Sequence, residues 1–318
     1  MGFLLYFLSS ILLIVLACFM SKTFNFYFKN FLFALIFLAC GMVVSIKSLS
    51  SPGDVRNMRW WRYSTHFLRL GSIFNIEIKS KNLKVLNSED SCVIVSNHQS
   101  EMDQIALVDV WNHIGGTCTI LAKESIKYMG SLGLGCLLSG VVFVDRKNRT
   151  KARAIMADCV RRMRDEKVKI WMYPEGTRSG NNQIDMLPFK KGAFHMAIQA
   201  QVPIVPVVFS YYKHQYNTQL RIFDKVKITA RVMEPLPTKG MTEDDVDSLL
   251  DTCRNRMLKT FYKISTYLPP TVQSSNNLEV KQSKEKIEQN QNELSRSDEM
   301  IDRSTAEDDD RRNFCESG

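Results

Sequence analysis

The sequence lacks several patterns that would assign it directly to a class of protein. Its eight cysteines include no C-x-x-C pair, and it has only 15 glycines and 9 prolines in 318 residues. The low glycine content excludes a collagen-like chain. The scattered cysteines exclude a disulfide scaffold and give no support to a zinc site. A G-x-S-x-G nucleophile elbow, a G-x-x-x-x-G-K-[ST] phosphate loop and an H-E-x-x-H motif are also missing.

Charged side chains are scarce at one end of the chain and crowded at the other. Residues 1–46 contain only Lys22 and Lys29, whereas residues 273–318 contain 7 basic and 12 acidic side chains. The net charge of +9 therefore divides into −5 for the tail and +14 for the rest. A basic body beside apolar segments indicates an anionic partner, either a phosphorylated ligand or a membrane surface. No DNA- or RNA-binding motif supports nucleic acid as that partner.

Two apolar runs predict a membrane-embedded helical hairpin over residues 1–50. Residues 3–20 form an uncharged run of 18, and residues 31–46 form a run of 16, which is short of the roughly 20 needed for an untilted span. Spanning and re-entrant hairpins both fit, whereas a secretory signal lacks its basic start. Basic residues after the second run place the body in the cytoplasm. Glycosylation at Asn148 would instead place it in the lumen.

Short β-branched runs alternate with helical stretches over residues 51–270. This alternation predicts an α/β domain with a mostly parallel sheet and flanking helices. The expected strands are 92–96, 119–122, 141–145, 168–172, 204–210 and 226–232. The expected helices are 103–111, 150–167, 192–201 and 243–264. After Pro270 the composition turns polar, so residues 271–318 are expected to form a disordered acidic tail.

A histidine and an aspartate follow the expected strand 92–96. His98 and Asp103 could not meet on one continuous helix, because five residues separate them by about 140°. If Ser100 caps the helix, His98 lies in the preceding turn and the Asp103 carboxylate can reach it. Such a carboxylate would make the other ring nitrogen a better base. The simpler interpretation is a capping box beside a loop histidine.

A second polar stretch, YPEGTRSG at residues 173–180, follows the expected strand 168–172. Ligands bind at the carboxyl ends of strands in open α/β sheets, and an arginine here can hold phosphate with two hydrogen bonds. An ordinary polar turn would look the same. Arg146 at the end of another strand, and Lys190 and Lys191 before a helix, are further candidate anion contacts.

Four stretches in this order resemble the glycerolipid acyltransferase family, and the 1-acyl-sn-glycerol-3-phosphate (lysophosphatidic acid) acyltransferases in particular. The resemblance covers roughly residues 50–265 and leaves the tail outside. The matching stretches are NHQSEMD (97–103), GVVFVDR (140–146), YPEGTRS (173–179) and LPFKKGAF with AQVPIVPVV (187–208).

The resemblance implies transfer of a fatty acyl group from acyl-coenzyme A to the sn-2 hydroxyl of lysophosphatidic acid, which gives phosphatidic acid in phospholipid biosynthesis. It implies that His98 is the general base and Asp103 its orienting partner. The residues implied for the acceptor's phosphate region are Glu175, Gly176, Thr177 and Arg178, assisted by Arg146. The acyl donor is a co-substrate, so no metal or cofactor is expected. The lipid bilayer of the endoplasmic reticulum is the implied location.

Three other functions remain open at this point. The acceptor could be another lysophospholipid or glycerol-3-phosphate, because family variants that use these acceptors share the motifs. A membrane adaptor that binds lipid without catalysis would not need the intact pair of His98 and Asp103. A hydrolase would need a nucleophile or metal that the sequence does not display. The sequence assigns no protein partner.

Overall fold

The computed structural model describes residues 2–66, 74–180 and 184–267. These residues belong to one compact unit, Met1–Tyr267. The expected acidic tail at 271–318 lies outside the described residues. Six cysteines have side chains that the structure describes; their thiols are free, and all but Cys136 are buried.

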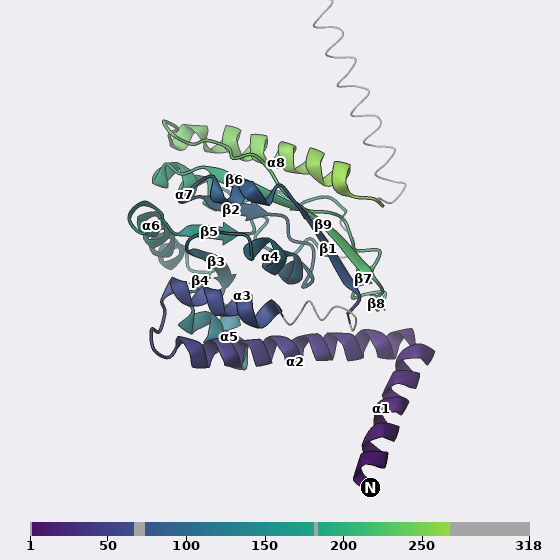
Figure 1. Ribbon diagram of the computed structural model, residues 1–318. Helices are drawn as coiled ribbons and strands as arrows, with labels where there is room; N and C mark the ends of the chain where they lie inside the picture. Colours follow the sequence, from purple (N-terminus) through teal and green to yellow (C-terminus); the bar gives the residue numbers. More distant parts are fainter. Residues whose placement is uncertain (1, 67–73, 181–183, 268–318) are drawn as a thin grey trace, which may run out of the picture. The chain divides into compact units, whose positions relative to one another are not determined.

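A mostly parallel sheet forms the centre of the unit (Figure 1). Within the described residues its seven strands run in the order β1-β9-β6-β2-β5-β3-β4, and β6–β9 is its one antiparallel pairing. The strands are β1 (Ile76–Lys81), β2 (Val93–Ser96), β3 (Cys118–Lys123), β4 (Val142–Val144), β5 (Lys169–Met172), β6 (Ile204–Phe209) and β9 (Val226–Val232). A separate antiparallel pair is formed by β7 (Tyr216–Asn217) and β8 (Ile222–Phe223). The predicted mostly parallel sheet is confirmed.

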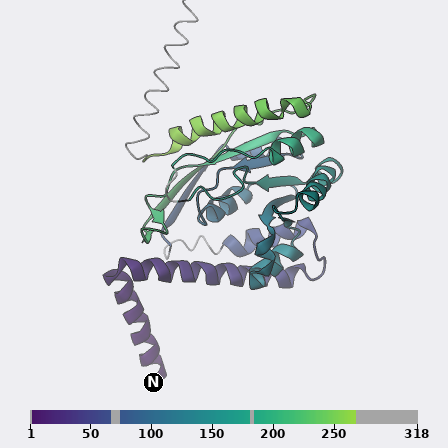
Figure 2. The ribbon, with the colours of Figure 1, turned by 180° about the vertical axis from the view of Figure 1, so that it is seen from behind.

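Helices cover both faces of this sheet, with α8 on one side and α4 on the other, whereas α2 packs against α3 and α5 (Figures 1 and 2). The helices are α1 (Gly2–Met20), α2 (Lys22–Ser48), α3 (Met58–His66), α4 (Asp103–Trp111), α5 (Gly130–Leu138), α6 (Arg149–Asp165), α7 (Gly192–Ala200) and α8 (Val246–Ile264). Short 3₁₀ turns lie at Val55–Asn57, Leu83–Asn87, Glu124–Tyr128 and Glu243–Asp245. The predicted flanking helices are therefore confirmed.

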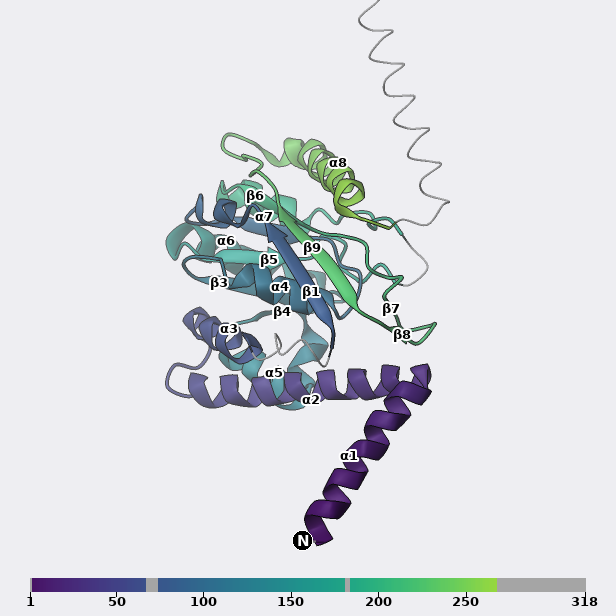
Figure 3. The same ribbon diagram turned by 45° about the vertical axis from the view of Figure 1, so that its right-hand side comes forward.

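Besides the short pair of β7 and β8, three longer elements were not expected from the sequence. Strand β1 is paired on one side only, with β9, and the two lie side by side in Figure 3. Its charged sequence, IEIKSK, suits an edge strand. The same charges interrupt the alternation of apolar residues by which a strand is predicted. Helix α5 has the sequence GSLGLGCLL, whose glycines favour a loop on propensity alone. Helix α3 was not predicted either.

The two apolar N-terminal segments are both helical. The residues between the two runs do not form a connection, because α2 begins at Lys22 and Ser21 alone separates it from α1. With 27 residues, α2 is long and apolar enough to cross a membrane. Much of its surface is apolar and exposed, at residues Phe24, Tyr27, Phe31, Leu35, Leu38, Met42, Val43 and Ile46. Such a surface in water is unfavourable and indicates association with a membrane.

Helix α2 crosses α5 at very short range. A Cβ atom added to Gly41 would lie 2.5 Å from the backbone oxygen of Ser131, and one added to Gly135 would lie 2.7 Å from the backbone oxygen of Gly41. The Ser131 hydroxyl also donates a hydrogen bond to the Leu38 carbonyl at 2.7 Å. Glycine at these positions lets the two backbones touch, so α2 is fixed to the α/β body.

Gly41→Val is therefore expected to push α2 away from α5. Overpacking of this kind costs about 1–3 kcal/mol, which corresponds to a melting temperature lower by roughly 2–10 °C. The measurement is thermal unfolding of the detergent-solubilised protein. Met42→Val, which places the same side chain on the exposed face of α2, is the control. Equal melting temperatures for the two variants would contradict the close crossing.

Candidate active site

The two main sequence motifs lie at the carboxyl ends of neighbouring strands. His98 follows β2, and the loop Tyr173–Gly180 follows β5. Because β2 and β5 are paired in parallel, both segments leave the sheet on the same side, at the carboxyl ends of the strands. The backbone N–H of Ser179 donates to the His98 carbonyl at 2.8 Å. The two motifs therefore form a single site.

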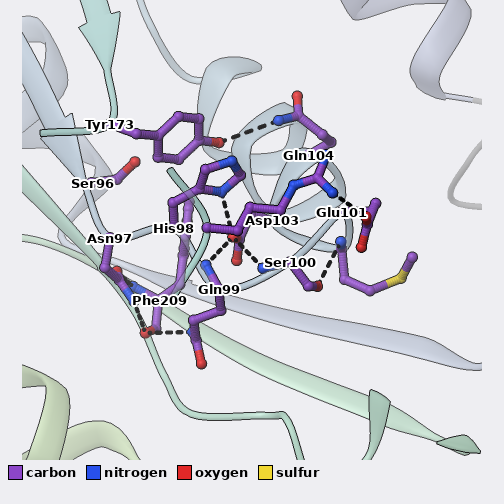
Figure 4. A network of polar contacts seen from close by, with 12 residues as sticks. Ser96, Asn97, His98, Gln99, Ser100, Glu101, Asp103, Gln104, Tyr173 and Phe209 are labelled. Carbon is purple, nitrogen blue, oxygen red and sulfur yellow. Dashed lines mark hydrogen bonds and ion pairs between the residues drawn. The ribbon is translucent and has the colours of Figure 1, made fainter. Parts of the chain in front are cut away.

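His98 and Asp103 form a hydrogen-bonded pair (Figure 4). His98 Nδ1 lies 2.8 Å from Asp103 Oδ2. Asp103 is the first residue of α4, so its carboxylate reaches back to the turn that carries the histidine. A carboxylate accepts hydrogen bonds, which places the proton of the neutral imidazole on Nδ1 and leaves the Nε2 lone pair available. The His98 side chain is 14% exposed and that of Asp103 is fully buried, so the pair is reached through the imidazole.

The Asp103 carboxylate is buried but fully hydrogen-bonded. Besides the imidazole, Oδ2 accepts the backbone N–H groups of Gln99 at 2.5 Å and of Ser100 at 3.0 Å. Oδ1 accepts the Tyr212 hydroxyl at 2.7 Å. Burial raises the pKa of Tyr212 well above its usual value, which keeps the hydroxyl protonated as a donor. Asp103 thus accepts the Ser100 N–H and orients His98 as well. The expected cap at Ser100 is not formed, because the N-cap of α4 is Met102 and makes no side-chain cap hydrogen bond.

Hydrogen bonds to the end of β6 hold the turn around His98 in place. Asn97 Nδ2 donates to the Phe209 carbonyl at 3.0 Å, and Asn97 Oδ1 accepts the Phe209 N–H at 2.8 Å. Gln99 Nε2 donates to the Ser210 carbonyl at 2.9 Å. These amide side chains replace missing strand partners where the sheet ends. They fix the turn, and hence the imidazole, to the central strand β6.

Tyr173 packs flat against the imidazole of His98. The two ring centroids are 3.9 Å apart and the ring planes differ by 15°. Gln104 Nε2, on the first turn of α4, lies 3.5 Å from the Tyr173 hydroxyl (Figure 4). One face of the imidazole is therefore covered, which restricts its rotation.

Glu175 lies behind the site and not on its surface. The residue is 2% exposed. Its Oε1 accepts the His98 backbone N–H at 2.7 Å, and its Oε2 accepts the Leu187 N–H at 2.9 Å. Burial raises the pKa of Glu175 to about 7. Both oxygens thus hold backbone segments, in contrast to the phosphate-region role that the sequence resemblance implied for this residue.

Gly176 and Lys190 lie against each other. Gly176 has a φ of 72°, and an added Cβ would lie 2.9 Å from Lys190 Cδ and 3.0 Å from Lys190 Nζ. The positive φ favours glycine here, and the flexible end of Lys190 lies beside it. Thr177, the next residue of the loop, is exposed. The Lys190 ammonium group, which comes from outside the loop, therefore lies close to the loop that carries the Thr177 hydroxyl.

Two further cations of the loop region have partners. Arg178 forms an ion pair with Glu101. Lys213 is buried and donates to Ser179 Oγ at 2.6 Å and to the Gly180 carbonyl. Burial lowers the pKa of Lys213 to about 8. The buried lysine therefore fixes the end of the loop, while the arginine is half exposed.

The other predicted anion contacts lie outside the loop after β5. Lys191 turns toward α8, where it pairs with Asp247 at 2.7 Å. Arg146 is exposed and follows β4, at the same sheet edge but two strands beyond β5. Within the described ranges, no cluster of three or more His, Cys, Asp or Glu side chains is arranged to hold a metal ion.

Sequence analysis did not identify Tyr173, Tyr212 or Lys213 as site residues. Tyr212 and Lys213 directly follow β6, which ends at the same sheet edge as β2 and β5. Polar residues after a third neighbouring strand were the signal that could have found them. Their contacts with Asp103 and Ser179 depend on the strand order, which the sequence does not reveal.

Comparison with known proteins identifies a matching family model and related sequences. A family model described as Acyltransferase matches residues 77–210. The chain is 38% identical over 262 residues to human 1-acyl-sn-glycerol-3-phosphate acyltransferase beta, a match that covers 81% of this chain and 91% of the relative. It is also 30% identical over 256 residues to the 1-acyl-sn-glycerol-3-phosphate acyltransferase of Saccharomyces cerevisiae, with 78% and 83% covered.

The fold also matches a solved structure. The crystal structure of the 1-acyl-sn-glycerophosphate acyltransferase PlsC from Thermotoga maritima aligns with a TM-score of 0.58 at 19% sequence identity. The alignment covers 78% of this chain and 97% of that one. The match confirms the predicted architecture.

Tyr212→Phe is expected to destabilise the protein, because it removes the donor to the buried Asp103 Oδ1. A hydrogen bond to a charged group contributes about 1.5–3 kcal/mol. The measurement is the free energy of unfolding from guanidinium denaturation in detergent. Tyr211→Phe is the control, since the Tyr211 hydroxyl makes no hydrogen bond among the described residues. A loss of less than 0.5 kcal/mol (on the order of an ordinary surface change) for Tyr212→Phe would refute this role.

Proposed function

The chain belongs to the acyltransferase family, and we propose that it transfers a fatty acyl group from acyl-coenzyme A to the sn-2 hydroxyl of lysophosphatidic acid. The product would be phosphatidic acid. Relatives named 1-acyl-sn-glycerol-3-phosphate acyltransferases that align over most of the chain support this acceptor. The observation that carries the chemistry is the pair of His98 and Asp103, whose geometry supports a general base.

The reaction needs one displacement, and a proton must pass from the acceptor hydroxyl to the leaving thiolate. His98 Nε2 takes the proton of the acceptor hydroxyl as the hydroxyl oxygen attacks the thioester carbonyl carbon. The new C–O bond forms and the C–S bond breaks, and the coenzyme A thiolate leaves with the proton returned by the imidazolium. Asp103 stabilises that imidazolium through the hydrogen bond to Nδ1–H. The thiolate is a good leaving group, so activation of the hydroxyl is the step at which a base matters most.

The acceptor's phosphate would bind to the loop after β5. Arg178 offers a planar fork of donors, Thr177 a hydroxyl, and Lys190 an ammonium group held beside Gly176. Arg146 would approach from the end of β4. We assign Glu175 to a positioning role instead, which is supported by its burial and by its hydrogen bond to the His98 backbone.

The acceptor and product are lipids, so the site must be reached from a bilayer. The exposed apolar side chains of α1 and α2 would contact that bilayer. The close crossing of α2 and α5 would then hold the α/β body at the membrane surface. An endoplasmic reticulum membrane is the proposed location, since it is the one implied by the family resemblance.

His98→Ala is expected to lower kcat by about 10²–10⁴-fold, the usual contribution of a general base. The measurement is transfer of labelled oleate from oleoyl-coenzyme A to lysophosphatidic acid by detergent-solubilised protein. His113→Ala, which removes an exposed histidine after α4, is the control. Near-normal turnover in a folded His98→Ala protein would overturn the assignment.

The same assay with other acceptors tests the proposed substrate. Glycerol-3-phosphate and lysophospholipids with larger headgroups replace lysophosphatidic acid, one at a time, with wild-type protein. Faster turnover of any of these would assign the chain a different acceptor.

Arg178→Ala is expected to raise the KM for lysophosphatidic acid about tenfold or more, because a charge-assisted hydrogen bond to phosphate is lost. The KM for oleoyl-coenzyme A should stay within about twofold. Arg161→Ala, which removes an ion-paired arginine of α6, is the control. An unchanged acceptor KM would count against Arg178 as a phosphate ligand.

A further inference from the structure

Glu101 forms an ion pair with Arg178, which is the side chain of the β5 loop best suited to bind phosphate. It lies in the turn between β2 and α4, and Arg178 lies in the loop after β5, so the ion pair bridges the two halves of the site. Both side chains remain open to solvent, with 38% of Glu101 and 51% of Arg178 exposed. Figure 4 shows Glu101 in the same cluster as His98, Asp103 and Gln104.

The pair cannot be explained as part of the support for His98. Asp103 is held by backbone N–H groups and by Tyr212, and Glu175 is held by backbone N–H groups. Neither relies on Glu101. The carboxylate of Glu101 instead accepts from the guanidinium at the place where an incoming phosphate would accept. A guanidinium recognises carboxylate and phosphate through the same donors, so the two anions exclude each other there.

We propose that Glu101 is an intramolecular competitor for the acceptor's phosphate at Arg178. This inference rests on the proposed function and assigns a regulator of affinity to the same site. Before the acceptor binds, the carboxylate neutralises the arginine. When the phosphate binds, the carboxylate swings toward solvent, and when the product leaves, it takes the arginine back.

The acceptor and the product carry the same phosphomonoester. Competition at Arg178 therefore weakens the binding of acceptor and product by the same factor. The product is released more easily, and the affinity for the acceptor is lower. Exposed ion pairs are weak, so the factor should be about 1.5- to 5-fold. The acyl donor does not bind through this arginine in the proposed reaction, so its affinity should not change.

Glu101→Gln tests the proposal, because it keeps the side-chain shape and removes the charge. We expect the KM for lysophosphatidic acid and the inhibition constant of phosphatidic acid to fall together by about 1.5- to 5-fold, with the KM for oleoyl-coenzyme A unchanged. The control is Glu166→Gln, which breaks a Glu–Arg pair of similar exposure at the amino end of β5. It should change none of these constants.

A second comparison separates competition at Arg178 from general repulsion between Glu101 and phosphate. In an Arg178→Ala background, Glu101→Gln should no longer lower the KM for lysophosphatidic acid. An equal decrease in both backgrounds would overturn the proposal, and so would an unchanged or higher KM in the single variant. Failure of the proposed function is a different result, namely no transfer to lysophosphatidic acid by the wild-type protein.

Discussion

The hydrogen bond between His98 and Asp103 connects the reacting group to the centre of the fold. Asp103 begins α4, and its other oxygen accepts from Tyr212 just after β6. A buried carboxylate with so many donors can occupy only one position, because each lost donor would leave charge unsatisfied in a region of low polarity. The imidazole is hydrogen-bonded to this carboxylate and is therefore held in one position as well. Small shifts of β2, α4 or β6 would therefore move Nε2.

The loop after β5 has an inner and an outer part, which are formed by residues close together in sequence. Glu175 turns inward and holds the backbone at His98, whereas Arg178 turns outward and is half exposed. Beneath the loop, burial raises the pKa of Glu175 to about 7 and lowers that of Lys213 to about 8. The two groups also attract each other, which partly offsets both shifts. The inner part of the loop is thus structural, and its outer part is left for an anionic ligand.

Much of the fold follows from the sequence, and the exceptions have physical reasons. The expected strand 226–232 and helix 103–111 match the structure at both ends. In the strand, apolar residues alternate at the period of two. The helix is apolar on most of its sides and buries six of its nine residues. Strand β1 was missed because an edge strand tolerates charge. Helix α5 was missed because Gly133 and Gly135 lower helix propensity, although the contact of Gly135 with α2 requires a residue without a side chain. Likewise, His98 and Asp103 were visible in the sequence, while Tyr212 and Lys213 come close only through the strand order.

Asp103 fixes His98 with its proton on Nδ1 and its lone pair on Nε2. Nitrogen NMR of protein labelled at its five histidines measures this directly, with the His98 signals assigned by their loss in a His98→Gln variant. At pH 8 we expect a protonated Nδ1 and an unprotonated Nε2 for His98, and loss of that preference in Asp103→Ala. A proton on Nε2 in the wild-type protein would overturn this assignment, because the nitrogen facing the acceptor could not then act as a base.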